Sequence, residues 1–251
     1  MTGLIDLTRI DRKALHSDPY TWALIDNLYQ PRDATKLAVT FPTDHFKTVH
    51  GYDGEKGYSY EGRCLLPMGS NSVCFPEELD PSWRQLGLDL ASTAYRQAMS
   101  RLTGCDLTEL SIEANVFHYG PGAWLGPHVD LKDKIVTHVL YFNEAWDPAN
   151  GGCLNILRSS DMADAAAEIV PIVGNSVVIV RSDRSWHAVS RVPERCRQSR
   201  RSMTVTFYAP GSISTMWPPG DQTPLHSYTE TQGNEMREES RVFSRLRRLF
   251  S

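Results

Sequence analysis

Apolar positions along the chain are first spaced about four residues apart and then alternate. The stretch from Asp80 to Gly104 begins with Asp-Pro, a helix-start signal, and ends on a glycine, a helix-stop signal. Inside it the apolar positions fit one face of an amphipathic helix: Leu86, Leu90, Ala94, Ala98 and Leu102. We therefore expect a single capped helix here, with one face buried.

Short β-branched or aromatic runs follow as far as residue 209, separated by Gly, Pro, Asn and Asp. They are LSIEANVFHYG, IVTHVLYFN, CLNILRS, EIVPIVGNSVVIVRS and RSMTVTFYAP. Several strands at this spacing indicate a sandwich or a barrel. The expected fold is mainly β with flanking helices.

The segments on either side of this β region are less regular. Residues 17–41 hold two short helical patterns broken at Pro31, and residues 49–72 predict turns with short strands. The ending ESRVFSRLRRLFS fits a basic amphipathic helix for a membrane surface or a partner, or an ordinary surface helix. We expect one domain over 1–251, with N-terminal helices and lid elements in 1–110, a β core in 111–210 and a tail in 211–251.

Composition narrows the function classes. The chain has 251 residues and a formal net charge of -4, so nothing indicates the basic stripe of a nucleic-acid binder. No stretch is apolar enough for a signal peptide or a membrane span. The five cysteines are odd in number and far apart, which is typical of reduced thiols and favours a cytoplasmic protein.

The stretch GPHVD carries the first candidate chemistry, because His128 and Asp130 lie one residue apart just before a β run. A metal site needs a further ligand from another strand, and His187, after NSVVIVRSDRSW, fits best. His138 lies within an apolar run and is expected to be a core residue. Two imidazoles and one carboxylate on one face of a metal are typical of non-haem Fe(II) oxygenases. Zinc hydrolases usually use HExxH, which this chain lacks.

The last β run offers a cation. Side chains alternate between the two faces of a strand. One face of this run carries Arg200, Ser202, Thr204 and Thr206, and the opposite face carries Arg201, Met203, Val205 and Phe207. The apolar face should pack on the helices and the polar face should line the barrel. A buried guanidinium needs a partner, and a dicarboxylate cosubstrate would bind it bidentately, with Ser202 and a tyrosine hydroxyl as further donors. The alternative is an ordinary arginine–carboxylate bridge.

Taken together, four segments resemble the 2-oxoglutarate- and Fe(II)-dependent oxygenases of the prolyl-4-hydroxylase-like group, over about residues 112–209. They are HYGPGAWLGPHVD, THVLYFNEAWDPANGGCLNIL, GNSVVIVRSDRSWHAVSRV and RRSMTVTFY. The resemblance implies a double-stranded β-helix, a jelly roll backed by helices. It also implies that Fe(II) is bound by His128, Asp130 and His187.

By the same resemblance, Arg200 would hold the distal carboxylate of 2-oxoglutarate, with Tyr141 as hydroxyl partner and Tyr119 lining the pocket. The interval from His187 to the arginine is a few residues longer than is usual in the family. Arg197 and Arg201 therefore stay open as alternatives for this role.

The activity implied is that of an Fe(II), 2-oxoglutarate and O₂-dependent dioxygenase that hydroxylates an unactivated C–H bond and releases succinate and CO₂. The Asp130 carboxylate favours hydroxylation over halogenation. We expect a small-metabolite substrate, such as an amino acid or a biosynthetic intermediate, free or carrier-bound. Side chains that flank the expected mouth are candidate substrate contacts: His118, Trp124, Arg63 and Trp186.

Two other functions stay open. The first is a protein hydroxylase that acts on a prolyl or other side chain. The second is a non-enzymatic jelly-roll binding module. We expect no nucleic-acid partner, and a contact with a carrier protein or with a second copy of the chain is left open.

Overall fold

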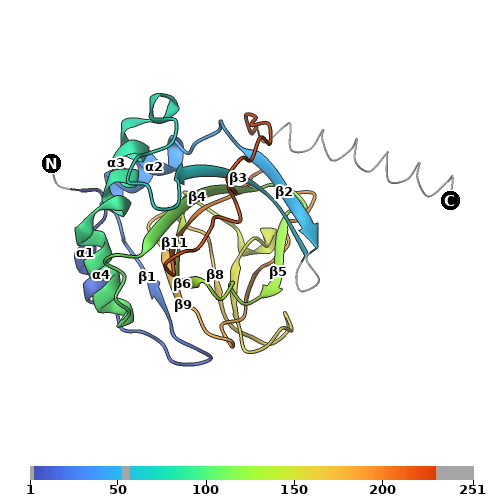
Figure 1. The fold of residues 1–251 in the computed structure, drawn as a ribbon. Helices are drawn as coiled ribbons and strands as arrows, with labels where there is room; N and C mark the ends of the chain where they lie inside the picture. The colour runs from blue at the N-terminus through green and yellow to red at the C-terminus, as the bar shows by residue number, and fades with distance from the viewer. Residues whose placement is uncertain (1–2, 53–56, 230–251) are drawn as a thin grey trace.

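The computed structural model describes residues 3–52 and 57–229, in which helices cover one side of a curled antiparallel sheet (Figure 1). The helices are α1 (Leu7–Asp11), α2 (Pro31–Val39), α3 (Pro81–Ala91) and α4 (Thr93–Thr103), with 3-10 turns at Pro76–Glu78 and Pro148–Asn150. The strands are β1 (Trp22–Ile25), β2 (Lys47–Tyr52), β3 (Gly57–Leu66), β4 (Ser111–Tyr119), β5 (Trp124–His128), β6 (Lys134–Tyr141), β7 (Leu154–Leu157), β8 (Ala165–Ile169), β9 (Ser176–Val180), β10 (His187–Val189) and β11 (Arg200–Tyr208).

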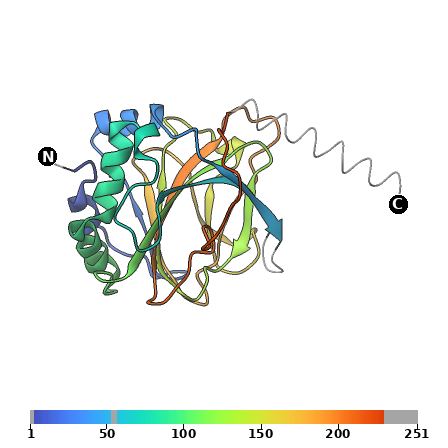
Figure 2. The same ribbon diagram turned by 45° about the horizontal axis from the view of Figure 1, so that its top comes forward.

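The strands form one sheet that curls on itself, in the order β1-β9-β6-β11-β4-β3-β5-β10-β7-β8, with β2 pairing on β3. Every strand pair is antiparallel. A short contact between β3 and β5 joins the two halves, through Tyr58 opposite Leu125 and Ser59 opposite Trp124. The expected double-stranded β-helix is confirmed, and the open barrel is seen end-on in Figure 2.

The two faces of β11 behave as alternation predicts. Met203, Val205 and Phe207 belong to the large apolar cluster that also holds the buried faces of α3 and α4. Arg200, Ser202, Thr204 and Thr206 line a cavity on the other face. The helical layer therefore covers the outside of the β4, β6 and β11 sheet and leaves the inside for chemistry.

The single helix expected over residues 80–104 is wrong, because Ser92 interrupts it with an extended backbone (φ -71°, ψ 148°). Its hydroxyl caps α4 by accepting a hydrogen bond from the Tyr95 amide at 3.1 Å. The break shifts the register, so that Tyr95 is buried and Ala94 is exposed. Most of the expected apolar face is still buried, at Leu86, Leu90, Ala98 and Leu102.

The helical patterns expected in residues 17–41 are only half correct. Pro31 begins α2 at its first position, where its missing N–H leaves no helical bond unmade, and so it does not break a helix there. The preceding pattern is the strand β1, which pairs with β9 from Trp22 opposite Ile179 to Ile25 opposite Ser176. Pairing with a buried strand outweighs the local preference.

After β11 the chain runs back across the barrel (Figure 1). His226 pairs with Phe46 before β2, and Met216 packs near Gly62 of β3. The basic ending ESRVFSRLRRLFS lies outside the described residues. Among residues 3–52 and 57–229, no helix has the length and apolar content to cross a bilayer. The cytoplasmic location and the contacts with a carrier protein or a second copy stay predictions.

Candidate functional site

Three ligand-type side chains meet at one end of the barrel. His128 ends β5 and His187 begins β10, and the two residues lie directly opposite each other in the sheet. Their ring centroids are 4.3 Å apart. Asp130 follows β5, and the three residues, all buried, offer ligand atoms that lie within 4.8 Å of one another. This arrangement can hold a metal ion on one face.

Backbone carbonyls orient both imidazoles. Nδ1 of His128 lies 2.9 Å from the Gly126 oxygen, and Nδ1 of His187 lies 2.9 Å from the Ser185 oxygen. A carbonyl accepts only, so each Nδ1 carries the proton and each Nε2 keeps a lone pair. A metal ligand needs that lone pair, and a carbonyl on the second nitrogen is the usual support for a ligating histidine.

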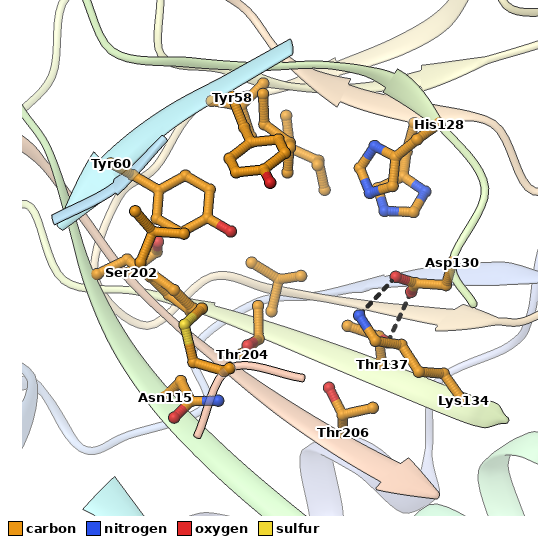
Figure 3. A pocket seen from close by; sticks show the side chains of 18 of the residues that line it. Tyr58, Tyr60, Asn115, His128, Asp130, Lys134, Thr137, Ser202, Thr204 and Thr206 are labelled. Atoms are coloured by element: carbon orange, nitrogen blue, oxygen red, sulfur yellow. Dashed lines mark hydrogen bonds and ion pairs between the residues drawn. The ribbon is translucent and has the colours of Figure 1, made fainter. Parts of the chain in front are cut away.

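Asp130 is held as an anion. Its Oδ1 accepts a hydrogen bond from Lys134 Nζ at 2.9 Å, and its Oδ2 accepts one from Thr137 Oγ1 at 2.8 Å (Figure 3). Burial alone would raise the pKa of this carboxyl, but the Lys134 ammonium beside it holds the pKa well below its usual range. The donor set is therefore two neutral imidazoles and one carboxylate, which suits Fe(II).

A buried cation, Arg200 at the start of β11, lines the cavity on the inner face of the sheet. Arg200 is 2% exposed, donates to Ser202 Oγ at 2.6 Å, and has its guanidinium carbon 4.8 Å from the Tyr119 ring and 5.3 Å from the Tyr141 ring. Burial raises the pKa of Tyr119 to about 12 and also raises that of Tyr141, so both hydroxyls are neutral donors. Among the described residues, Arg200 Nε and the Tyr141 hydroxyl have no hydrogen-bond partner. These donors fit a carboxylate brought by a ligand.

The neighbouring arginines do not reach this point. Arg197 is exposed, and Arg201 lies on the opposite face of β11, with its guanidinium over the Phe41 ring and a hydrogen bond to the Ala38 oxygen. Of the arginines left open by the spacing, only Arg200 lines the cavity.

The cavity has a volume of about 350 Å³. It is lined by the cluster of His128, Asp130 and His187, named here the metal-type cluster, and by Arg200 and a wall of strands. Its wall follows the ladder of β4, β11 and β6, in which Phe117, Ser202 and Tyr141 make one row and Asn115, Thr204 and Val139 the next. Tyr58 and Tyr60 of β3 face this wall from the other side (Figure 3).

Sequence reasoning missed several cavity residues. Glu113, Asn115 and Tyr208 line the cavity. Lys134 lines it as well, is about three-quarters covered and is bonded to Asp130. Glu and Asn at alternate positions of a predicted strand were the available signal for the first two. Lys134 could not be placed, because the sequence does not show that β6 begins at this residue.

The four candidate substrate contacts do not line the cavity. Arg63 is fully buried on the other face of β3. Its Nε donates to the backbone carbonyl of Asp44 at 3.1 Å, and its Nη1 donates to the backbone carbonyl of Cys64 at 3.0 Å. His118 also faces outward, bonded to Ser199 Oγ at 2.7 Å and to the Pro42 oxygen at 3.0 Å. Alternation on β3 and β4 turns both side chains away from the barrel.

The two tryptophans lie outside the cavity as well. Trp124 is half-buried on β5, and the Arg191 guanidinium carbon lies 3.9 Å from its ring centroid. Trp186 is half-buried directly before His187, and its carbonyl accepts a hydrogen bond from the Tyr20 hydroxyl at 2.9 Å. Both are packing residues next to the site.

Comparison with known proteins agrees with this geometry. Residues 114–208 match the family model of the 2OG-Fe(II) oxygenase superfamily. A prolyl-4-hydroxylase from Pseudomonas putida is similar in fold at 18% identity, with a TM-score of 0.53 over 81% of this chain and 97% of that one. A prolyl 4-hydroxylase from Phytophthora capsici gives 17% identity and a TM-score of 0.54, over 84% and 68% of the two chains.

A prolyl hydroxylase from Trichoplax adhaerens, solved with a peptide of hypoxia inducible factor, gives 13% identity and a TM-score of 0.51, over 81% of this chain and 87% of that one. No curated protein sequence matches the chain. The jelly roll with its His-Asp-His cluster defines the class of non-haem iron enzymes. Over residues 114–208 the chain is similar to the 2OG-Fe(II) oxygenase superfamily, whose members use Fe(II), 2-oxoglutarate and O₂. This match and the His-Asp-His cluster identify the chain as an enzyme, and the alternative of a non-enzymatic binding module is set aside.

Proposed function

We propose that this chain is a dioxygenase that hydroxylates an unactivated C–H bond of a small metabolite, such as an amino acid or a biosynthetic intermediate. His128, Asp130 and His187 would bind Fe(II), and Arg200 with Tyr141, Tyr119 and Ser202 would bind 2-oxoglutarate. One observation carries the proposal. A cavity of about 350 Å³ is lined both by the cluster of His128, Asp130 and His187 and by Arg200, whose buried Nε has no hydrogen-bond partner among the described residues.

When bound, Fe(II) with 2-oxoglutarate and O₂ supplies the oxidising chemistry for the C–H bond, with release of succinate and CO₂. The chain's own residues hold the metal-ligand side chains in position and orient them. Thr137 and Lys134 fix the Asp130 carboxylate, and the backbone carbonyls at Gly126 and Ser185 fix the two rings. Phe117 and Val139 give the cavity an apolar wall, which limits water inside it.

The size of the cavity supports a metabolite over a protein substrate. A volume of about 350 Å³ is at the small end of the range for ligand pockets, and the cosubstrate must share it. Thr215 and Met216, from the segment after β11, also line the cavity. A protein hydroxylase would need an open groove for several residues of a peptide.

The test of the cofactor assignment is an anaerobic titration of the apo-protein with Fe(II) and 2-oxoglutarate, read by the weak visible charge-transfer band of the chelate. We expect the band in the wild type and its loss in Asp130→Ala. In Arg200→Ala the dissociation constant of 2-oxoglutarate should rise by roughly thirtyfold or more, because a buried carboxylate loses its charged partner. Well-folded wild-type protein that gives no band would overturn the proposal.

The substrate class is tested by succinate formation under air. A panel of small metabolites is compared with proline-containing peptides, and the Arg200→Ala variant serves as the inactive control. The proposal expects stimulation by members of the metabolite panel. Stimulation by peptides alone would favour the protein hydroxylase.

A further inference from the structure

Glu113 is a buried carboxylate on the cavity wall, and the proposed reaction gives it no role. It is 1% exposed, and its Oε2 accepts hydrogen bonds from Asn115 Nδ2 at 3.1 Å and from the Tyr208 hydroxyl at 3.2 Å. Its Oε1 accepts one from Ser214 Oγ. All three donors are uncharged, and within the described ranges Glu113 makes no ion pair.

Two cations, Lys134 and Arg200, line the same cavity, and neither forms an ion pair with Glu113. The Lys134 ammonium lies 2.9 Å from Asp130 Oδ1, and Arg200 lies six residues along β11 from Thr206, which is opposite Glu113. Six residues of strand span roughly 20 Å. Lys134 acts on Glu113 through space, but its ammonium is paired directly with Asp130. A buried carboxylate without a directly paired cation is costly, so a ligand that brings a cation would be favoured there.

Glu113 lies near the metal-type cluster without touching it. In the sheet it shares a row with Thr206 of β11 and Thr137 of β6, and Thr137 donates to Asp130. Strands are about 4.8 Å apart, so two strand spacings put the backbones of Glu113 and Thr137 roughly 10 Å from each other. A group bound at Glu113 would leave a short chain of atoms between itself and the metal.

We propose that Glu113 binds the ammonium group of the substrate, and that the substrate is a small primary amine oxidised a few bonds from its nitrogen. This inference rests on the proposed function. Asn115 and Tyr208 fix the carboxylate, and the hydroxyls of Thr204 and Thr206 can accept the remaining ammonium hydrogens. The competing explanation is that Glu113 only anchors the segment after β11 through Ser214.

The experiment uses butylammonium chloride and its neutral analogue 1-butanol, with binding read by ligand-observed saturation-transfer NMR. The proteins are the wild type, Glu113→Gln and Tyr208→Phe. Glu113→Gln removes the charge but keeps a hydrogen-bonding side chain, and Tyr208→Phe removes one donor but keeps the charge. The chelate band with Fe(II) and 2-oxoglutarate is measured on the same samples.

We expect the wild type to bind butylammonium in preference to butanol, and Glu113→Gln to lose this preference by roughly tenfold or more. Tyr208→Phe should keep a clear part of the preference, because the charge of Glu113 remains although one of its hydrogen-bond donors is lost. Equal binding of the two probes by the wild type, no binding of butylammonium, or an equal loss in both variants would overturn the inference. The chelate band reports on the proposed function separately. A missing band with intact ammonium selectivity would sink the cofactor assignment alone.

A second inference comes from a cysteine pair outside the cavity. The Sγ atoms of Cys64 and Cys74 lie 3.5 Å apart, Cys64 buried on β3 and Cys74 half-buried in the loop before α3. The amide of Cys74 donates to the Leu65 oxygen at 2.9 Å and so holds this loop along β3. The contact with the Cys64 sulfur lowers the pKa of Cys74 to about 7, which raises the thiolate fraction of Cys74 at neutral pH.

We infer that Cys64 and Cys74 form a disulfide when glutathione disulfide is present. The Cys74 thiolate attacks one sulfur of glutathione disulfide and expels a glutathione thiolate. The Cys64 thiol then loses its proton and attacks the Cys74 sulfur, which releases the second glutathione. The net reaction oxidises two protein thiols and reduces one glutathione disulfide to two molecules of glutathione.

The test is incubation of the whole protein with glutathione disulfide, followed by peptide mapping without reductant. We expect a peptide linked through Cys64 and Cys74 and a melting temperature raised by roughly 5 °C, both reversed by dithiothreitol. Cys105→Ser is the matched control and should react like the wild type. In Cys64→Ser, Cys74 should stop at the mixed disulfide. A stable mixed disulfide in the wild type, or no reaction, would contradict the inference.

Discussion

The Asp130 carboxylate shows how single residues prepare this site. Both of its oxygens are already oriented, one by Lys134 and the other by Thr137, while the rings of His128 and His187 are turned by backbone carbonyls. Groups that orient metal ligands usually matter nearly as much as the ligands themselves. Thr137 is the most direct test of this support, because its side chain can be changed with little change of volume.

Thr137→Val should weaken Fe(II) binding by about tenfold to a hundredfold, because the carboxylate loses one of its two orienting donors. Thr137→Ser keeps the hydroxyl and should bind Fe(II) like the wild type. The measurement is anaerobic titration with Fe(II) in the presence of 2-oxoglutarate. Equal affinity in the Val variant would show that Lys134 alone orients Asp130.

The same residues show what the sequence can and cannot predict. His128, Asp130, His187 and Arg200 could be found because each lies at a strand end or on a defined strand face, and the structure brings them into one cavity. Arg63 and His118 were misplaced because which face of β3 and β4 points inward depends on strand pairing, which no local pattern shows. Only the sheet decides whether a polar strand residue lines the barrel.

Among the helices, the break at Ser92 is the feature that local pattern did not predict. The Ser92 hydroxyl accepts from the Tyr95 amide and donates to the Asp89 oxygen at 2.6 Å, so one side chain ends α3 and begins α4. The apolar spacing continues across the break, and so the pattern looks like one helix. A cap residue inside a helical pattern was the signal available.

Ser92→Ala should lower the free energy of unfolding by about 1 kcal/mol, the usual cost of losing an N-cap. Ser92→Asp keeps an acceptor for the Tyr95 amide and should stay within a few tenths of the wild type. Urea unfolding followed by circular dichroism measures both. If the alanine variant is as stable as the wild type, the break is imposed by packing and not by the cap.

The Gly-Gly pair in the loop before β7 lies against the segment that follows β10. Gly151 has φ +57°, and a Cβ atom there would lie 2.1 Å from the Arg191 carbonyl oxygen. A backbone oxygen cannot rotate away as a side chain can. The loop therefore accepts only glycine at this position.

Gly151→Ala should destabilise the fold by roughly 3 kcal/mol or more, since it adds a backbone clash to an unfavourable φ. Gly104→Ala is the matched control, because Gly104 has φ +72° and a Cβ added there would meet no atom within 4 Å, so only the conformational cost of about 1 kcal/mol remains. Urea unfolding compares the two variants. Equal losses would show that the Arg191 segment moves away at little cost.

For the whole molecule, the layer between the sheet and its helical cover contains two buried histidines. His118 lies among Phe41, Phe46 and Tyr228, with Arg201 as the charge that acts on it, and His138 is bonded through Nδ1 to the Tyr95 hydroxyl at 2.8 Å. Burial lowers the pKa of each ring to about 3. Their neutral forms are therefore part of the folded state.

This burial should make stability fall with pH below the ordinary histidine range. In the unfolded chain the rings take up protons near pH 6.5, while the folded protein resists protonation down to about pH 3. The unfolded state therefore binds more protons between these values, so the stabilisation is complete above pH 6.5 and is lost as pH falls. Each ring should cost about 2 kcal/mol between pH 7 and pH 5.

His138→Gln isolates one ring, since glutamine can still accept from Tyr95 but does not titrate. Urea unfolding at pH 7, 6 and 5 should show a decline with pH that is shallower than in the wild type by about 2 kcal/mol over the two units, or about 1 kcal/mol per unit on average. His50→Gln, at an exposed position on β2, is the control and should leave the decline unchanged. Because carboxylates titrate in all three proteins, the difference between variants carries the result. An unchanged decline in His138→Gln would mean that this ring takes up its proton within the folded core.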